Sequence, residues 1–336
     1  MSGGGRAAAP TGLTRAADVV AAGGPRLASL LERANERLRE VAAGHGESLA
    51  AHASATLAAG GKRLRPTLVF IAAGQASSPE LVEATVAVEL LHMASLVHDD
   101  VLDRADMRRG SPTVFASGGR QPATATGDLL FSRAFAVLAA TGRADAVRAL
   151  SDASSGLARG ELMQRQDAWS GDVTPERYLE RCRLKTARLF EACGRLGALL
   201  GDPGAGAADG LGAYGDRIGV AFQVLDDVLD VAGPSERTGK PRGTDLLDGT
   251  VTLPLILARR TDADLRALDL RTAVTDAETA AEVCDRIAAT GALAAAREWA
   301  LGYVAEAKAS LDGLDLEPEQ RRLLDLVADG VVERYA

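Results

Sequence analysis

A short acidic motif, DDVLD, occurs twice in this chain, at 99–103 and at 226–230. In each copy the first and last carboxylates are four positions apart, so on a helix they share one face, a single turn apart. Carboxylates this close repel one another unless a cation neutralises them. Such oxygen ligands suit Mg²⁺, which completes its shell with waters and phosphate oxygens. The two copies therefore indicate a Mg²⁺–diphosphate site between two helices.

One copy alone could equally be a solvated acidic helix face. Two copies, each following an apolar helical run, weaken that alternative. Gln223 lies three residues before Asp226 on the same helix face, from which it can hydrogen-bond to whatever the metal holds.

Basic residues accompany both motifs, as an anionic ligand would require. Arg binds phosphate oxygens in a bidentate way and Lys supplies a point charge. Any one of them could be a solvated surface base, but two clusters flanking two acidic motifs favour a function. They are Lys62, Arg63 and Arg65 after a Gly-Gly pair, Arg108 and Arg109 after the first motif, Lys185 before Thr186, and Lys240 after the second motif.

Two histidines precede the first motif. A histidine in an apolar helix is more often a hydrogen-bonded core residue than a ligand or base. His98, next to Asp99, fits that description. His92 lies seven residues before Asp99, two turns back on roughly the same face, and could reach a second phosphate group.

The remaining composition describes the protein that must position these groups. The 336 residues are 47% hydrophobic and only 4% aromatic, which favours helix-on-helix packing, and the net charge of −8 argues against a nucleic-acid partner. Three scattered cysteines, Cys182, Cys193 and Cys284, indicate a reducing compartment. No transmembrane segment is expected. We therefore expect a cytoplasmic protein.

Helical periodicity begins near Arg26, after a flexible lead-in over 1–25, and continues to Tyr335. Ser78-Pro79 predicts a helix start, and Pro66 suits a first helical turn. The pattern predicts a long functional loop at 105–122, a flexible connector at 201–210, and helices near 126–140, 144–164 and 175–200. Without repeats or runs of strands, it predicts an all-α bundle, one domain over 26–336, with a cavity between two Asp-bearing helices.

The motifs resemble, in order, those of the trans-polyprenyl diphosphate synthases, from about Gly60 to the C-terminus. They are GGKRLRP at 60–66, HDDVLD at 98–103, RRG at 108–110, GD at 127–128, KTA at 185–187, QVLDD at 223–227, GKPRGTD at 239–245 and TLP at 252–254. The resemblance implies the class I isoprenoid synthase fold. It also implies a Mg²⁺-dependent prenyltransferase that condenses isopentenyl diphosphate with an allylic diphosphate.

The family's roles can be carried over by position. The resemblance implies that about three Mg²⁺ ions are held by Asp99, Asp103 and Asp226, with Asp227 and Asp230 supporting through bound water. It places isopentenyl diphosphate on Lys62, Arg65, His92 and Arg109. It places the allylic diphosphate on Arg108, Lys185, Thr186, Gln223 and Lys240. The allylic C–O bond then ionises, isopentenyl diphosphate attacks the cation, and the released pyrophosphate takes the proton, so no protein base is needed.

Product length is expected to depend on Ala94, five residues before the first Asp, where short-chain family members often carry an aromatic floor. A small residue there predicts a product longer than C20. Phe131 or Phe135 could still cap the tunnel, which would leave geranylgeranyl (C20) or farnesyl diphosphate as the product. Thr250 stands where the family commonly has Lys, and Arg242 could compensate for the missing charge.

Two other functions stay open on sequence grounds. A class I terpene cyclase shares the fold and first motif, but not the second DDxxD or the GGKRLRP segment. A non-catalytic subunit of a heteromeric synthase generally loses the Asp motifs, and both are intact here. The resemblance implies a homodimer, and it allows transient membrane contact during product release.

Overall fold

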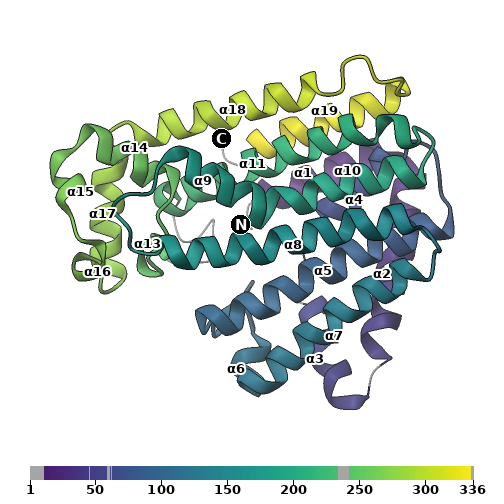
Figure 1. The fold of residues 1–336 in the computed structure, drawn as a ribbon, viewed down its shortest axis with the longest axis horizontal. Coiled ribbons are helices and arrows are strands. Elements are labelled where there is room, and N and C mark those ends of the chain that lie inside the picture. Colours follow the sequence, from purple (N-terminus) through teal and green to yellow (C-terminus); the bar gives the residue numbers. More distant parts are fainter. Residues whose placement is uncertain (1–10, 45, 59–60, 62, 234–241, 334–336) are drawn as a thin grey trace, which may run out of the picture.

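The computed structural model describes residues 11–44, 46–58, 61, 63–233 and 242–333. These residues form helices joined by turns, with a single two-stranded hairpin, so the predicted all-α class is confirmed (Figure 1). The helices α5, α7, α8, α10, α11 and α18 run along the length of the molecule, and the helices α13 to α17 gather at one end (Figure 1).

The first half of the chain supplies the elements from α1 to α7. Its elements are α1 (Thr11–Ala22), α2 (Gly24–Ala43), α3 (Glu47–Ala58), α4 (Leu64–Ala72), α5 (Pro79–Asp103), β1 (Met107–Arg108), β2 (Ser111–Pro112), α6 (Val114–Gly118) and α7 (Arg120–Ala139).

The second half of the chain supplies the elements from α8 to α19. Its elements are α8 (Ala144–Asp167), α9 (Pro175–Cys182), the π-helical turn η1 (Arg183–Ala187), α10 (Arg188–Leu200), the 3₁₀ turn η2 (Ala205–Ala207), α11 (Ala208–Ala232), α13 (Thr244–Leu247), α14 (Leu253–Thr261), α15 (Ala263–Ala267), α16 (Leu270–Ala273), α17 (Ala277–Ala289), α18 (Ala292–Ala309) and α19 (Pro318–Glu333).

Helix α5 is the central element and carries the first acidic motif at its C-terminal end. It starts as predicted: the Ser78 side chain accepts a hydrogen bond from Leu81 N, and Pro79 fills the first helical position, where its missing N–H costs nothing. Among the described helices α5 alone is long and apolar enough to cross a membrane. However, 72% of its apolar window is buried inside the protein, as expected of a core helix.

Glycines allow η1 to pack closely between α8 and α11. A Cβ atom at Gly160 of α8 would lie 2.4 Å from Lys185 N, and one at Gly219 of α11 would lie 2.5 Å from Ala187 Cα. Neither position can accept a side chain without moving the backbone. This contact holds the KTA segment between the two helices, in the middle of the site described below.

The segment 105–122, predicted as a loop, is largely ordered into short elements. Met107 pairs with Pro112 and Arg108 with Ser111 across a two-residue turn in which Arg109 and Gly110 both have positive φ. That conformation suits the right-handed twist of a tight hairpin and explains the glycine of the RRG motif. Helix α6 follows, and α7 begins at Arg120, earlier than predicted, with Pro122 in its first turn.

Two further segments differ from the sequence expectation. Residues 11–22 form α1 and α2 begins at Gly24, within the predicted lead-in, and Val19 of α1 is buried in the core. In the predicted connector, η2 covers Ala205–Ala207 and α11 starts at Ala208. Short polar or glycine-rich segments of the sequence predict turns well. They cannot show that a neighbouring helix covers the apolar face of a short helix.

Candidate active site

The first motif lies at the C-terminal end of α5, and its three carboxylates have different surroundings. Asp99 is half-buried, and burial raises its pKa to about 6, although nearby Lys185 favours the charged form. Asp100 is buried and accepts a hydrogen bond from Arg108 Nε at 2.8 Å. Asp103 accepts one from Arg165 Nη2 at 2.5 Å. Asp99 and Asp103 therefore face the site, and Asp100 holds the hairpin.

The second motif lies near the C-terminal end of α11. Asp227 is buried, with one oxygen accepting from Tyr178 and the other from Gln223, each at 2.7 Å. Burial and the neighbouring Asp226 carboxylate raise the pKa of Asp227. The Asp230 carboxylate accepts from the backbone N–H of Asp245 at 3.2 Å, which ties the segment after α11 to the motif.

The π-helical turn η1 carries Lys185 and Thr186, both predicted site residues. Thr186 Oγ1 donates to Gln223 Oε1 at 2.7 Å, which fixes the Gln223 amide so that its nitrogen faces Asp227. Burial disfavours the charge on Lys185, but Asp99 and Glu161 outweigh it and raise the lysine pKa. π-Helical turns often occur at functional sites because they rotate side chains out of the regular helical register.

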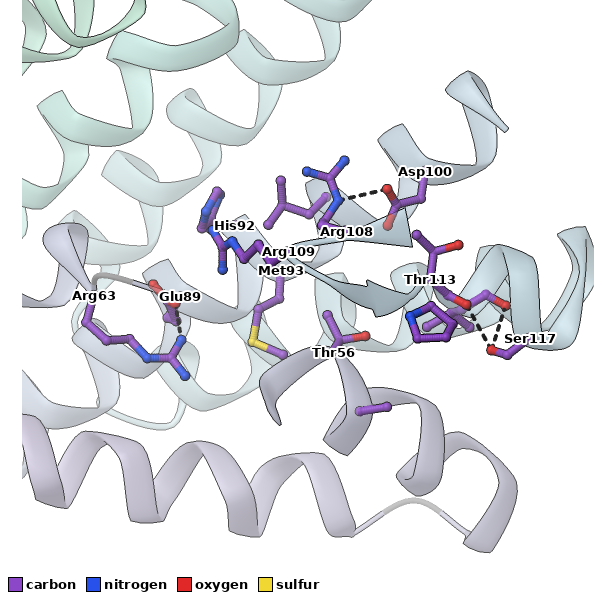
Figure 2. A pocket seen from close by; sticks show the side chains of 14 residues that line it. Thr56, Arg63, Glu89, His92, Met93, Asp100, Arg108, Arg109, Thr113 and Ser117 are labelled. Carbon is purple, nitrogen blue, oxygen red and sulfur yellow. Dashed lines mark hydrogen bonds and ion pairs between the residues drawn. The ribbon is translucent and has the colours of Figure 1, made fainter. Parts of the chain in front are cut away.

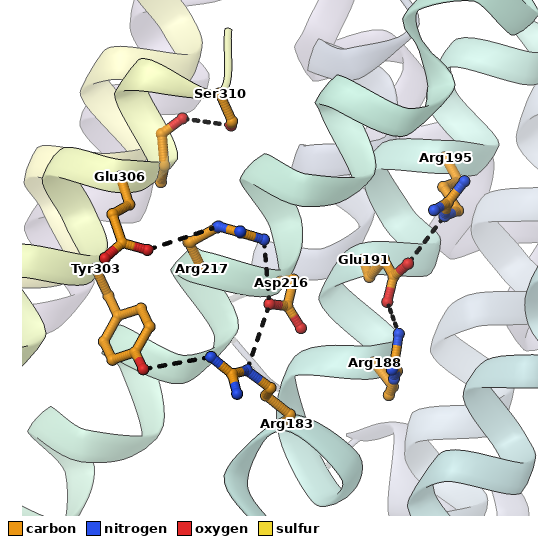
Figure 3. A network of polar contacts seen from close by, with 10 residues as sticks. Arg183, Arg188, Glu191, Arg195, Asp216, Arg217, Tyr303, Glu306 and Ser310 are labelled. Carbon is orange, nitrogen blue, oxygen red and sulfur yellow. Dashed lines mark hydrogen bonds and ion pairs between the residues drawn. The ribbon is translucent and has the colours of Figure 1, made fainter. Parts of the chain in front are cut away.

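A network of polar residues ties Arg183, the first residue of η1, to α11 and α18 (Figure 3). Arg183 donates to the Tyr303 hydroxyl of α18 at 3.4 Å and lies 3.9 Å from the Asp216 carboxylate of α11. Arg217 pairs with Glu306 at 3.8 Å. Such half-exposed ion pairs add little stability individually. Together they connect the first residue of η1 to α11 and α18.

Sequence reasoning missed two residues of α8, Glu161 and Arg165. Glu161 accepts from Lys185 Nζ at 2.5 Å and from Arg165 Nε at 2.9 Å. A Glu and an Arg four positions apart are usually a surface pair. The available signal was Gly156 and Gly160, also four apart, which mark the face of α8 that a neighbouring backbone approaches.

A cavity of about 50 Å³ lies beside the first motif and is lined by three arginines, Arg63, Arg108 and Arg109, and by His92 (Figure 2). Burial and the surrounding arginines Arg65, Arg109, Arg108 and Arg63 lower the His92 pKa well below its ordinary value. Arg63 forms an ion pair with Glu89.

The structure describes some of the other predicted basic residues and not others. Arg65 is half-buried, its guanidinium stacks 4.5 Å from the centre of the Phe190 ring, and its enclosed Nε atom has no hydrogen-bond partner among the residues that the structure describes. The Arg109 guanidinium packs against the Gly61 backbone. Lys62 and Lys240 lie outside the described residues.

His98 is a structural neighbour of the site, as expected. Its ring packs against Gly127 of α7 and stacks on Phe131 with ring centroids 5.6 Å apart, and Nε2 lies 3.3 Å from the Asp128 carboxylate. Ala94 is fully buried one helical turn earlier on α5. Helical periodicity places it on the same side as His98, along the packing seam with α7.

The predicted compensation of Thr250 by Arg242 finds no support. Arg242 Nε donates to Val231 O at 2.5 Å and Nη2 to Asp285 at 2.7 Å, so its guanidinium joins the end of α11 to α17. Thr250 is half-buried, with its N–H donating to Asp245 O at 2.7 Å.

The donor set suits a hard cation that brings its own additional ligands. Within the described ranges, no group of three or more His, Cys, Asp or Glu side chains is arranged to hold a metal ion by itself. Asp99, however, is enclosed near Asp103 and Glu161, which raise its pKa further beyond the effect of burial. A divalent ion would relieve this repulsion, and substrate oxygens and waters would complete its shell.

Comparison with known proteins agrees with this geometry. The family model described as polyprenyl synthetase matches residues 47–290. Heptaprenyl diphosphate synthase component 2 from Geobacillus stearothermophilus is 40% identical over 274 residues, which cover 80% of this chain and 85% of the relative. Geranylgeranyl diphosphate synthase from Methanosarcina mazei is 37% identical over 284 residues, covering 82% and 86%.

Solved structures resemble the whole chain. Decaprenyl diphosphate synthase from Rhodobacter capsulatus superposes with a TM-score of 0.87 and 33% identity, covering 96% of this chain and 99% of that one. A polyprenyl synthase from Caulobacter crescentus CB15, complexed with calcium and isoprenyl diphosphate, gives 0.83 and 30%, covering 99% and 100%. The family model that matches residues 47–290, a relative at 40% identity and a fold shared over almost the full length identify the chain as a member of the polyprenyl synthetase family, a prenyl diphosphate synthase.

Proposed function

We propose that this protein condenses isopentenyl diphosphate with an allylic diphosphate to give a trans-polyprenyl diphosphate longer than C20. The observation that carries the proposal is the adjacency of two opposite environments at one end of α5. The acidic residues Asp99 and Asp103 lie on one side, and the arginine-lined cavity around His92 lies beside them. One environment suits a metal-bound diphosphate, and the other suits a diphosphate held by cations alone.

The allylic diphosphate fits the metal side. Asp99, Asp103 and Asp226, with Asp230 nearby on α11, would hold Mg²⁺, about three ions by family resemblance, and the relative crystallised with calcium and isoprenyl diphosphate supports this assignment. When bound, the metal supplies positive charge to the departing diphosphate. Lys185 adds a cation that is already oriented by Glu161, and Arg108 approaches from the hairpin.

Thr186 and Gln223 orient the site. Because the Gln223 amide is fixed at both ends by Thr186 and Asp227, its direction is set before substrate arrives. Such preorganised dipoles stabilise charge that develops as the allylic C–O bond breaks, without having to reorient during the reaction. Lys240 is proposed to join this group from outside the described residues.

Isopentenyl diphosphate fits the arginine-lined cavity. His92, Arg109 and Arg65 would bind its diphosphate, together with Lys62, which lies outside the described residues. The Arg65 Nε atom, enclosed and without a partner among the described residues, is a donor that a ligand oxygen can satisfy. Holding both substrates in fixed positions places the double bond of one against the ionising carbon of the other.

The length of the product is proposed to depend on the seam between α5 and α7. Ala94 leaves this part of the seam without a bulky side chain, and the heptaprenyl and decaprenyl relatives are consistent with a product longer than C20. The geranylgeranyl relative keeps a C20 product as the alternative. Phe131 and Phe135 of α7 are partly buried against the core and could provide a floor.

The direct test incubates the full chain with Mg²⁺, labelled isopentenyl diphosphate and C5, C10, C15 or C20 primers, and sizes the products by chromatography. Elongation beyond C20 is expected. Products that end at C15 or C20 would support the shorter alternative. Failure with every primer would contradict the proposed synthase activity and favour a non-catalytic subunit. The name of one relative, heptaprenyl diphosphate synthase component 2, is consistent with that alternative.

A matched pair of variants separates chemistry from folding. Lys185→Gln should lower turnover by about 100-fold, because it removes a cation that faces the departing diphosphate. Lys308→Gln removes a surface ion pair with Asp329 and should leave turnover unchanged. Light scattering of the purified chain tests the proposed homodimer, for which a mass of one chain would be the contrary result.

A further inference from the structure

Arg165 is a cation that belongs to none of the sequence motifs, yet it bridges the acidic side of the site. Its Nη2 atom donates to Asp103 at 2.5 Å and its Nε atom to Glu161 at 2.9 Å. The other Glu161 oxygen accepts from Lys185 Nζ at 2.5 Å. Residues of α5, α8 and η1 thus form one chain of alternating charges, from Asp103 through Arg165 and Glu161 to Lys185.

In the ligand-free protein, this series of ion pairs neutralises the charged side chains that the metal and the diphosphate would contact. Asp103 is a proposed metal ligand, and in the ligand-free protein a guanidinium contacts its Oδ1 atom. A divalent ion at this carboxylate would compete with Arg165 for the same oxygen and would repel its positive charge. Binding of the metal would therefore weaken the contact between the Arg165 guanidinium and Asp103.

The position of Arg165 gives its guanidinium an alternative partner. The side chain is 42% exposed and stays tethered by Glu161, four residues earlier on the same face of α8. Just beyond the end of α8, Trp169 N donates to Gly249 O at 2.8 Å, in the same segment whose Asp245 N–H binds Asp230. This end of α8 therefore lies between the two acidic motifs, where a metal-bound diphosphate would lie.

We propose that Arg165 is a further residue that binds the allylic diphosphate. It neutralises Asp103 in the ligand-free protein and moves to a diphosphate oxygen when the metal takes its place. The planar guanidinium suits both partners, because carboxylate and phosphate oxygens accept the same pair of N–H donors. The inference rests on the proposed function, since it takes the diphosphate and the metal from it.

Two binding titrations on Arg165→Gln test the exchange without relying on turnover. Mn²⁺ alone, followed by the electron paramagnetic resonance of the free ion, should bind the variant about fivefold more tightly. The reason is that the guanidinium that competes with the ion for the partly exposed Asp103 carboxylate has been removed. Inorganic pyrophosphate with saturating Mg²⁺, followed by calorimetry, should bind about fivefold more weakly, because one charged donor is lost. Arg165→Lys should keep part of the pyrophosphate affinity.

Arg159→Gln is the matched control, since it removes the same charge from an exposed position of α8 six residues earlier, on another face. It should change neither titration. Unchanged pyrophosphate affinity in Arg165→Gln would overturn the proposal, and so would a change of both affinities in the same direction. If the wild-type chain fails to elongate any primer, the proposed function fails. If it elongates while Arg165→Gln binds pyrophosphate normally, only this inference fails.

Discussion

Tyr178 donates its hydroxyl hydrogen to Asp227 at 2.7 Å in the protein core, where Tyr178 is 0% and Asp227 4% exposed. The second carboxylate of the QVLDD motif is therefore bound by protein on both oxygens, since Gln223 donates to the other. Asp227 orients Gln223, which in turn binds Thr186 of η1. The motif thus combines a side that faces the ligands with a side that fixes the site to the core.

Tyr178→Phe should lower the free energy of unfolding by about 1–3 kcal/mol, because a buried carboxylate oxygen loses its donor while the packing stays almost the same. Urea denaturation measures this loss. Tyr303→Phe is the control, because its half-buried hydroxyl only accepts from Arg183 at 3.4 Å, and it should cost about 0.5 kcal/mol or less. Equal losses for the two variants would contradict a special contribution from the Asp227 contact.

The sequence predicts the fold class, the long helices and most residues of the candidate site, whose functions stay predictions, because apolar periodicity and short motifs are local signals. It does not predict η1, since the residues RLKTA are typical of an ordinary α-helix. The π-helical turn forms where Gly160 and Gly219 let two neighbouring backbones approach. For the same reason Glu161 and Arg165 were missed: their spacing resembles a surface pair until α8 packs against η1. The role of Arg242 at the end of α11 likewise depends on α17, a contact that is distant in sequence.

His92 should make the stability of the ligand-free protein depend on pH. The folded protein holds the His92 pKa well below the ordinary 6.5, so between these two values the unfolded chain binds more protons than the folded protein. The free energy of unfolding should therefore fall as the pH drops below about 6.5, by at most about 1.4 kcal/mol per pH unit for one proton. Denaturation of wild type and His92→Gln at several pH values measures the difference.

In this comparison the wild type should lose stability relative to His92→Gln on acidification from pH 7.5 to 5.5. The same substitution at His52, which does not line the arginine-rich cavity, is the control. Saturating pyrophosphate should reduce the effect, because an anion bound among the arginines favours a protonated imidazole. A constant difference between wild type and variant across this range would show that His92 is not the titrating group.

Ala94→Phe should shorten the product, because a ring at a fully buried position on the α5–α7 seam would block the path proposed for the growing chain. Overpacking should also lower the free energy of unfolding by about 1–3 kcal/mol. Chromatography of the products and thermal denaturation of the same preparation measure the two effects.

Ala300→Phe is the matched control for Ala94→Phe, since Ala300 is equally buried but lies on α18, away from this seam. It should lose stability without a change in product length. If Ala94→Phe makes products of wild-type length, the floor lies elsewhere, and substitutions at Phe131 and Phe135 become the next test.

Removal of the Asp99 charge should have opposite effects on stability with and without ligands. Burial raises the Asp99 pKa from 3.8 to about 6, so the folded protein binds this proton more tightly than the unfolded chain does. The contribution to stability is therefore present at low pH and is lost as the pH rises from about 4 to 6. At pH 7.5 in chelator, Asp99→Asn should be more stable than wild type by about 1 kcal/mol, allowing for solvent screening.

Addition of Mg²⁺ and pyrophosphate should stabilise the wild type, because these ligands bind the folded state, and should leave the variant almost unchanged. Thermal denaturation measures all four combinations, with Asp209→Asn, whose side chain is 92% exposed, as the control that should follow the wild type. A variant that is less stable in chelator, or that gains the full stabilisation from Mg²⁺ and pyrophosphate, would remove Asp99 from the proposed metal ligands.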